Sequence, residues 1–365
     1  MKKKILMIVP LPPPITGQSY ASLFLYEKLK DRFDIEVLNY SRKNAVEKSK
    51  PDFYFIKKII EIGKEIKIKS KKSDIVYFTI SQSILGNLKD LFFLFKMGKL
   101  GRKKTIIHLH GGYFDRFLNK APFMIKLFNK ILFKNIKEGV VLGKSLIKCL
   151  LPIIPDNRIS VVPNFYDKNL RILQEDFFNK WNNPDKINIL FLSNLMIEKG
   201  YLDLLEAFFI LPEEIKKRLN LYFAGNFENE NNKIYFLKKI EKFENIKYFG
   251  VVEGEKKKAL LQKSHCFVLP TYVSFGEGQP ISILESYASG LVVFTTDWGG
   301  IKDIFCNDSN GITIRPKSPE SIRDAIVDLF DNFEKYKKIA RFNLQYSLNF
   351  SEEAFVKNIS ELLEK

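Results

Sequence analysis

Short apolar runs alternate along the chain with longer stretches in which apolar residues recur at helical spacing. Several runs are apolar on both faces, which is typical of strands in a parallel sheet that helices cover on either side. The runs lie at residues 5–9, 35–39, 75–79, 105–109, 139–142, 159–162, 187–192, 219–224, 246–249, 266–269, 292–295 and 311–314. Their regular alternation with helical segments predicts repeated βαβ units and doubly wound α/β sheets.

These runs form two successive series, each of about the usual domain length of ~150 residues. The stretch between the series carries loop-forming residues: Pro163, Asn164, Asn182, Asn183 and Pro184. The chain has 365 residues, of which 45% are hydrophobic. Because a single core stops growing near ~250–300 residues, two domains are expected. We place these two Rossmann-like domains at residues 1–165 and 166–345.

The cysteines and the apolar segments restrict the class of protein. Cys149, Cys266 and Cys306 are widely spaced and form no CxxC pair, which favours a reducing compartment and argues against a structural zinc site. The apolar run near the amino terminus is shorter than the ~7–15 residues of a secretory signal. We find no uninterrupted apolar stretch of the ~18–20 residues that a membrane-spanning helix needs.

Positive charge is concentrated in the first half of the chain. Residues 1–165 hold 32 Lys and Arg against 13 Asp and Glu, a balance of +19, whereas the remainder holds 27 against 29, a balance of −2. A one-sided field of this kind attracts a polyanion: an anionic membrane, a nucleic acid or a phosphorylated substrate. A Lys-rich genome is the alternative explanation, although it does not account for the neutral second half.

Ligands of open α/β sheets bind beyond the carboxyl ends of the strands, so the loops there are the candidate sites. After the first strand, Gly17 allows close approach of a ligand and a helix begins near Gln18, which suits phosphate. After the fourth strand, His110 precedes two glycines. His108 lies two positions earlier and reads equally well as a hydrogen-bonded core histidine.

Two further loops in the second half carry polar chemistry. Lys199 follows a strand and precedes a helix, where a lysine can offset the charge of a diphosphate. The strongest signal is the segment 275–285, in which Glu277 lies in a glycine-bearing loop at a helix start and Glu285 about two turns further along. Backbone N–H groups with carboxylates suit a phosphorylated, polyhydroxylated ligand. Two solvated surface glutamates are the alternative interpretation.

Residues 122–137 predict a helix with lysines on one face. At helical spacing Lys126, Lys130, Lys134 and Lys137 share that face, with Phe123 and Leu127 among them, and we expect Met124, Phe128, Ile131 and Leu132 on the opposite side. Lysines beside exposed apolar residues can dock on an anionic bilayer. The segment 43–72 is similarly rich in lysine and apolar residues. An ordinary solvated helix face explains the same pattern.

The motifs, in their order, resemble the retaining glycosyltransferases of family 4, which have the GT-B fold. The resemblance runs nearly end to end. It rests on PPPITG at 12–17, HLHGG at 108–112, VVPN at 161–164, LSNLMIEKG at 192–200, the E-x7-E block at 277–285 and TDWGGIKDI at 296–304. The E-x7-E block is the most specific of these motifs.

The resemblance implies roles for individual residues. The first domain would bind the acceptor and the second the nucleotide sugar, across a central cleft, with a final helix at about 346–365 crossing back to the first domain. The catalytic residues would be His110 and Glu277. The donor-binding residues would be Gly17, Asn194, Lys199, Val251, Gly278, Gln279, Pro280, Ile281 and Glu285.

Two departures from the family pattern affect the expected donor site. Asn194 stands where the family usually has an arginine, so the diphosphate clamp would have one cation, Lys199, instead of two. Asp303 replaces the more frequent glutamate. The sequence contains no D-x-D motif, and a metal-independent site is expected, in which Lys199 and helix N–H groups replace the metal ion.

We therefore expect a retaining glycosyltransferase that uses a nucleotide-diphosphate sugar, a UDP-sugar in the first instance, and needs no cofactor or metal. Its acceptor would be lipid-linked or a glycan, and the basic first domain would dock on the cytoplasmic face of the membrane during polysaccharide, lipopolysaccharide or glycan synthesis. The alternatives are a sugar-nucleotide epimerase or hydrolase of the same fold, and a basic nucleic-acid-binding protein. The last lacks a recognisable basic-aromatic module, so we expect no nucleic-acid partner.

Overall fold

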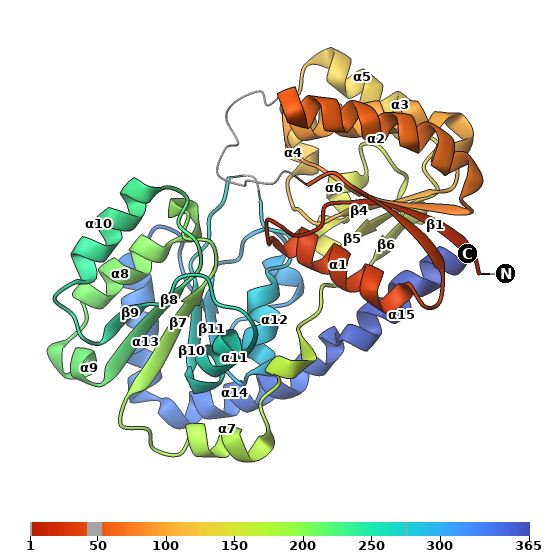
Figure 1. Ribbon diagram of the computed structural model, residues 1–365. Coiled ribbons are helices and arrows are strands. Elements are labelled where there is room, and N and C mark those ends of the chain that lie inside the picture. Colours follow the sequence, from red (N-terminus) through yellow and green to blue (C-terminus); the bar gives the residue numbers. More distant parts are fainter. Residues whose placement is uncertain (1, 42–52, 275) are drawn as a thin grey trace. The chain divides into compact units, whose positions relative to one another are not determined.

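The computed structural model describes residues 2–41, 53–274 and 276–365 (Figure 1). The chain separates into two compact units. The first consists of Met1–Asn164, Phe275–Gln279 and Glu353–Lys365, and the second of Phe165–Ser274 and Pro280–Glu352. The short segment before residue 280 thus packs with the first unit, although the sequence-based ranges place it in the second domain.

The first unit is built on a parallel six-stranded sheet with the order β2-β1-β3-β4-β5-β6. Its strands are β1 (Lys4–Val9), β2 (Asp34–Asn39), β3 (Ile75–Ile80), β4 (Thr105–Leu109), β5 (Glu138–Val141) and β6 (Ile159–Val161). Every strand lies within one residue of its predicted range. β3 and β4 are buried along their whole length, as central strands covered on both faces must be.

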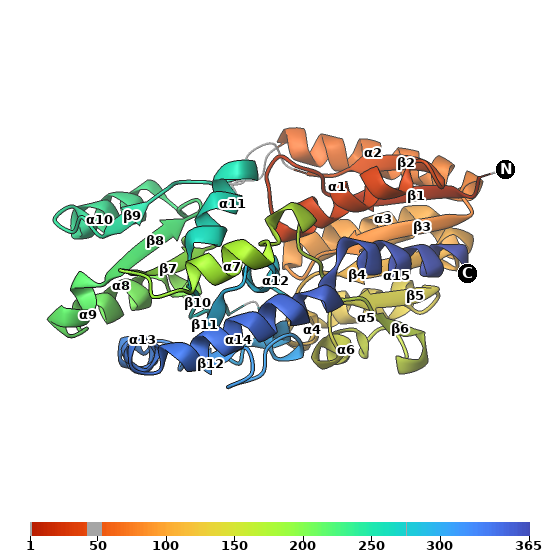
Figure 2. The same ribbon diagram turned by 90° about the horizontal axis from the view of Figure 1, so that it is seen from below.

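Helices cover both faces of this sheet. They are α1 (Gly17–Leu29), α2 (Phe53–Lys72), α3 (Ile84–Arg102), α4 (Phe114–Lys120), α5 (Phe123–Phe133), α6 (Ile147–Leu150) and α15 (Glu352–Glu364). On one face α3 packs between α2 and α5, and on the other α1 lies beside α15 (Figures 1 and 2). The rings of Phe24 and Phe355 join these last two helices, with centroids 6.5 Å apart.

The second unit has the same architecture, with the strand order β12-β11-β10-β7-β8-β9 and all pairs parallel. Its strands are β7 (Ile187–Leu192), β8 (Leu219–Ala224), β9 (Ile246–Tyr248), β10 (Cys266–Leu269), β11 (Val292–Thr295) and β12 (Gly311–Thr313). These strands too lie within one residue of the predicted ranges. The two parallel sheets with their helices give the α/β fold of two Rossmann-like units that the sequence predicts.

The helices of the second unit are α7 (Gln174–Lys180), α8 (Tyr201–Phe209), α9 (Glu213–Lys217), α10 (Glu230–Ile240), α11 (Gly254–Lys263), α12 (Ile281–Ala288), α13 (Pro319–Asp331) and α14 (Phe333–Tyr346). α8 packs beside α13, and α12 beside α14. The core between these helices and the sheet is rich in aromatic side chains, among them the fully buried Trp181, Tyr201 and Tyr287. In the described ranges no helix is long and apolar enough to cross a membrane.

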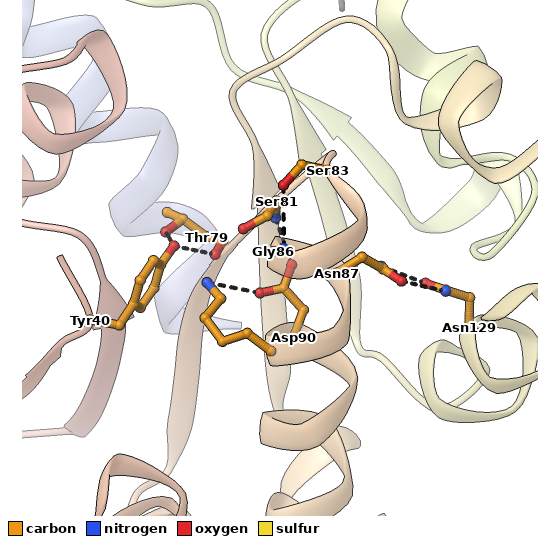
Figure 3. A network of polar contacts seen from close by, with 9 residues as sticks. Tyr40, Thr79, Ser81, Ser83, Gly86, Asn87, Asp90 and Asn129 are labelled. Carbon is orange, nitrogen blue, oxygen red and sulfur yellow. Dashed lines mark hydrogen bonds and ion pairs between the residues drawn. The ribbon is translucent and has the colours of Figure 1, made fainter. Parts of the chain in front are cut away.

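Helix α3 carries a buried ion pair (Figure 3). The ammonium of Lys89 lies 3.0 Å from Oδ1 of Asp90, and their side chains are 7% and 0% exposed. The backbone N–H of Ser81 donates to Oδ2 of Asp90 at 2.6 Å, and Lys89 Nζ lies 3.3 Å from the centre of the Tyr40 ring. Burial raises the pKa of Asp90 to about 6 and lowers that of Lys89. Each charge therefore depends on the other for its stability.

Helix α5 is shorter than predicted and packs through a different face. It ends at Phe133, so Lys137 lies beyond it. Asn129 is fully buried because its amide exchanges hydrogen bonds of 3.0 and 2.8 Å with that of Asn87 on α3 (Figure 3). Of the four apolar residues predicted on the side opposite the lysines, Leu132 is buried, whereas Met124, Phe128 and Ile131 are exposed.

Candidate active site

In the first unit, the turn after β4 packs against the loop that contains Glu277. A Cβ atom added to Gly112 would lie 2.1 Å from the carbonyl oxygen of Glu277, and one added to Gly278 would lie 2.2 Å from that of His110. Such distances leave no room for a side chain, so glycine at both positions allows the two backbones to touch. The structure thereby brings the backbone around His110 close to Glu277 and Gly278, which the family resemblance selects as a catalytic and a donor-binding residue.

Asn164 fixes the same loop from a third segment of the chain. Its backbone N–H donates to Oε1 of Gln279 at 3.0 Å, and its side-chain amide donates to the carbonyl of Gln279 at 2.8 Å. Both residues are buried, where hydrogen bonds that satisfy polar groups are strongly retained. The VVPN, HLHGG and E-x7-E motifs therefore meet at one place. Asn164 was predicted as a loop former and as part of the VVPN motif, whereas its anchoring role becomes visible only in the structure.

His110 stacks on His108 at this edge of the sheet. The ring centroids are 4.0 Å apart, and the Tyr77 hydroxyl hydrogen-bonds to Nδ1 of the fully buried His108. Burial lowers the pKa of His110 to about 4 and holds the pKa of His108 well below its usual range. Both imidazoles are therefore neutral near pH 7, and His110 can hydrogen-bond a hydroxyl without carrying charge. His108 is buried in the core and hydrogen-bonded, as one interpretation of the sequence predicted.

Gly17 lies at the first residue of α1, beyond the carboxyl end of β1. Thr16 caps this helix, because its side chain accepts from the Ser19 N–H at 3.1 Å while its own N–H donates to the Ser19 hydroxyl at 2.8 Å. The first turn holds no acidic residue. The exposed amino end of the helix therefore retains the positive dipole that suits an anion.

In the second unit, three of the expected donor-binding residues follow strands of the sheet. Asn194 comes after β7, Lys199 ends a short 3-10 turn in the same loop, and Val251 comes after β9. Because the carboxyl ends of parallel strands share one edge of a sheet, all three lie along it. Asn194 and Val251 are exposed, and Lys199 is half-buried.

The turn that carries Lys199 is held firmly. The carboxylate of Glu198 accepts from the N–H and the hydroxyl of Ser274 at 3.1 and 3.2 Å, and its carbonyl accepts from the Tyr272 N–H at 2.8 Å. Gly200 has a φ of +79°, and a Cβ there would meet Pro270 at 2.5 Å. This geometry requires glycine and fixes the position of the lysine backbone against the loop after β10.

Glu285 is buried on α12, whose first residue is Ile281 and whose N-cap is Pro280. Only 2% of its side chain is exposed, and its Oε1 pairs with the ammonium of Lys257 on α11. As predicted, Glu277 lies in the loop before this helix and Glu285 lies within the helix. Glu277 precedes α12 by four residues, since Pro280 and the positive φ of Gly276 (+71°) keep this loop out of helical conformation.

Lys257, the ion-pair partner of Glu285, was not among the residues predicted from the sequence. It is the middle one of three consecutive lysines on α11, and such a run is usually a solvated surface. The signal was therefore ambiguous. Across residues 2–41, 53–274 and 276–365, no group of three or more His, Cys, Asp and Glu side chains could hold a metal ion.

The chain is similar to known glycosyltransferases in sequence and in fold. The family described as "Glycosyl transferases group 1" matches residues 174–344. The uncharacterized glycosyltransferase MJ1069 of Methanocaldococcus jannaschii is 26% identical over 72% of this chain and 69% of its own. The N,N'-diacetylbacillosaminyl-diphospho-undecaprenol alpha-1,3-N-acetylgalactosaminyltransferase of Campylobacter jejuni is 24% identical over 68% of this chain and 65% of its own.

A crystal structure of Anabaena Alr3699/HepE in complex with UDP and glucose has a TM-score of 0.74 to this chain, with 14% identity, and the match covers 99% of both chains. At that identity the likeness concerns the fold. Residues 174–344 are thus similar to group 1 glycosyltransferases, and the two parallel sheets with their helices match the two-domain α/β fold of solved glycosyltransferase structures.

Proposed function

We propose that this protein transfers a glycosyl group, with retention of anomeric configuration, from a UDP-sugar to a lipid-linked or glycan acceptor at the cytoplasmic face of the membrane. The observation that carries the proposal is the contact of the His110–Gly112 turn with the Glu277 loop. The name of the Campylobacter relative describes a diphospho-undecaprenol acceptor, and the Anabaena protein was crystallised with UDP and glucose. Both support this choice of substrates.

The donor is assigned to the residues that the family resemblance selects. Lys199 offsets the diphosphate charge, with Asn194 and the α1 amino end at Gly17 as hydrogen-bonding partners. Glu285 accepts from the ribose hydroxyls, and Val251 lies near the base. Glu277 and the backbone of Gly278, Gln279, Pro280 and Ile281 meet the sugar. No metal takes part in this scheme, since lysine and helix N–H groups stabilise the leaving diphosphate.

The reaction proceeds by attack of the acceptor hydroxyl on the face from which the diphosphate leaves. The leaving phosphate accepts the acceptor proton as the bond to the anomeric carbon breaks. Neutral His110 hydrogen-bonds a hydroxyl of the transferred sugar, where an imidazolium would oppose the positive charge that develops on the ring. This role accords with the low pKa of His110.

Nucleotide binding tests the donor assignment. UDP is expected to raise the unfolding temperature of the protein equally with Mg²⁺ and with EDTA, because ligand binding to the folded state stabilises it. Glu285→Ala is expected to weaken UDP binding roughly 10- to 100-fold, since hydrogen bonds to a charged group are lost. Glu334→Ala, an exposed glutamate at the start of α14, serves as the control and retains wild-type affinity. A protein that responds to no nucleoside diphosphate would contradict the proposal.

The membrane assignment rests on the outward face of α2, α3 and α5. These neighbouring helices expose large apolar side chains: Phe53, Tyr54, Ile56, Ile60, Ile68, Leu85, Leu88, Phe95, Leu100, Phe123, Met124, Leu127, Phe128 and Ile131. Lysines such as Lys126 and Lys130 lie among them and are exposed. Apolar groups inserted at a lipid interface, with ammonium groups near anionic headgroups, bind such a surface reversibly. Of the segment 43–72 that was singled out, residues 43–52 lie outside the described part.

Vesicle binding tests this surface. The protein is expected to sediment with vesicles of phosphatidylglycerol and phosphatidylcholine, and to bind pure phosphatidylcholine far less, because each lysine near an anionic leaflet contributes about 1 kcal/mol. The variant Phe123→Ser/Leu127→Ser should lose roughly 10-fold or more in affinity, since two apolar side chains no longer enter the interface. The control Ile234→Ser/Leu237→Ser removes exposed apolar residues of α10 and should bind as before. Equal loss in both variants would contradict the assignment.

A further inference from the structure

Lys257 and Glu285 form an ion pair between α11 and α12 at a distance of 2.5 Å. The lysine side chain is 25% exposed and the glutamate 2%. We propose that Lys257 is a positioning residue of the donor site: it orients the buried Glu285 carboxylate to accept hydrogen bonds from the ribose hydroxyls of the nucleotide. This inference rests on the proposed function, because it assigns a partner to a residue of that site.

The burial of Glu285 explains why a partner is needed. An isolated carboxylate withdrawn from water is unstable as an anion, and a neighbouring cation restores the charged form. An ionised carboxylate accepts about four hydrogen bonds over its two oxygens. The ammonium of Lys257 donates to Oε1, so the carboxylate retains acceptor capacity for hydroxyl groups. The ammonium thus fixes the direction of the carboxylate while leaving the glutamate able to bind sugar.

The two helices place this pair where a nucleotide of the proposed kind would lie. α11 begins directly after the loop that carries Val251 at the end of β9, and α12 begins after the loop that follows β10. Lys257 is in the first turns of α11, close to the edge of the sheet at which ligands of such folds bind. Lys256 precedes it on the same helix but is exposed, so the chain itself offers a matched control.

The test compares UDP with 2′,3′-dideoxy-UDP by calorimetry. The unchanged protein is expected to bind UDP roughly 10- to 100-fold more tightly, which corresponds to the loss of hydrogen bonds to a charged acceptor. Lys257→Met should reduce this preference to about 2-fold, because the Glu285 carboxylate loses the contact that orients it. Lys256→Met should retain the full preference, and Lys257→Arg should restore most of it. A role confined to folding would alter affinity for both ligands alike.

Removal of one member of a buried pair can also destabilise the protein. The variant Lys257→Met/Glu285→Gln leaves no unpaired charge, and it is expected to fold and to lack the hydroxyl preference. If Lys257→Met binds UDP with the undiminished preference, the role of Lys257 is refuted while the donor site stands. If the unchanged protein binds UDP and the dideoxy compound equally, or binds neither of them, both the role of Lys257 and the proposed donor site are refuted.

Discussion

Replacing Gly112 by alanine is expected to reduce the rate of sugar transfer about 100-fold. The added Cβ would lie 2.1 Å from the carbonyl oxygen and 3.1 Å from the carbonyl carbon of Glu277. Neither is a flexible side-chain atom, so the Glu277 loop must move away. A displacement of about 1 Å at a reacting centre can lower a rate by that factor. The measurement is the initial rate of UDP release from the donor in the presence of acceptor.

The neighbouring glycine provides the control for this prediction. A Cβ on Gly111 would meet the far end of the Gln82 side chain at 2.2 Å, and that side chain can rotate away at the cost of its hydrogen bond from the Tyr113 N–H. Gly111→Ala should therefore retain activity within about 10-fold of the unchanged protein. Equal activity of Gly112→Ala and the unchanged protein would show that the backbone contact does not position catalytic groups.

Neutralising one member of the Lys89–Asp90 pair is expected to lower the free energy of unfolding by about 3–5 kcal/mol. Both side chains are buried, so Lys89→Met leaves an anion and Asp90→Asn leaves a cation without its partner in a medium that solvates neither. The free energy is obtained from urea unfolding followed by circular dichroism. Lys99→Met, which removes an exposed lysine from the last turn of the same helix, should change it by less than ~0.5 kcal/mol.

The double variant Lys89→Met/Asp90→Asn separates charge from packing. Asparagine keeps an acceptor for the Ser81 N–H, which in the native protein donates to Asp90 at 2.6 Å, and methionine keeps most of the lysine volume. Because no unpaired charge remains, the double variant should recover most of the loss. Additive destabilisation by the two changes would mean that the charges are not coupled in the folded protein.

The sheets could be predicted closely because their strands are buried on both faces. The ends of a continuous apolar run such as Ile75–Ile80 can be read from the sequence, since polar residues mark where the strand leaves the core. The loops after the strands were found for the same reason. The candidate residues His110 and Lys199 were located because each follows a strand, and each therefore lies beyond the carboxyl end of a strand in the sheet of its own unit.

Contacts between distant segments could not be predicted in this way. The buried face of α5 depends on the Asn87–Asn129 pair, and a polar residue gives no sign in the sequence that it will be buried. Likewise, Lys257 becomes distinct from Lys256 only when α12 places Glu285 opposite it. The hydrophobic pattern of the sequence predicted which apolar segments are buried, whereas the pairing of buried polar side chains became visible only in the tertiary structure.

Main-chain atoms of the Glu277 loop make close contacts with the rest of its unit. Gly112 and Gly278 allow the backbones to touch, and Asn164 binds the carbonyl of Gln279. The path of the loop thus depends on the absence of side chains at positions 112 and 278, so any larger residue at either position would shift all the groups that the loop carries together.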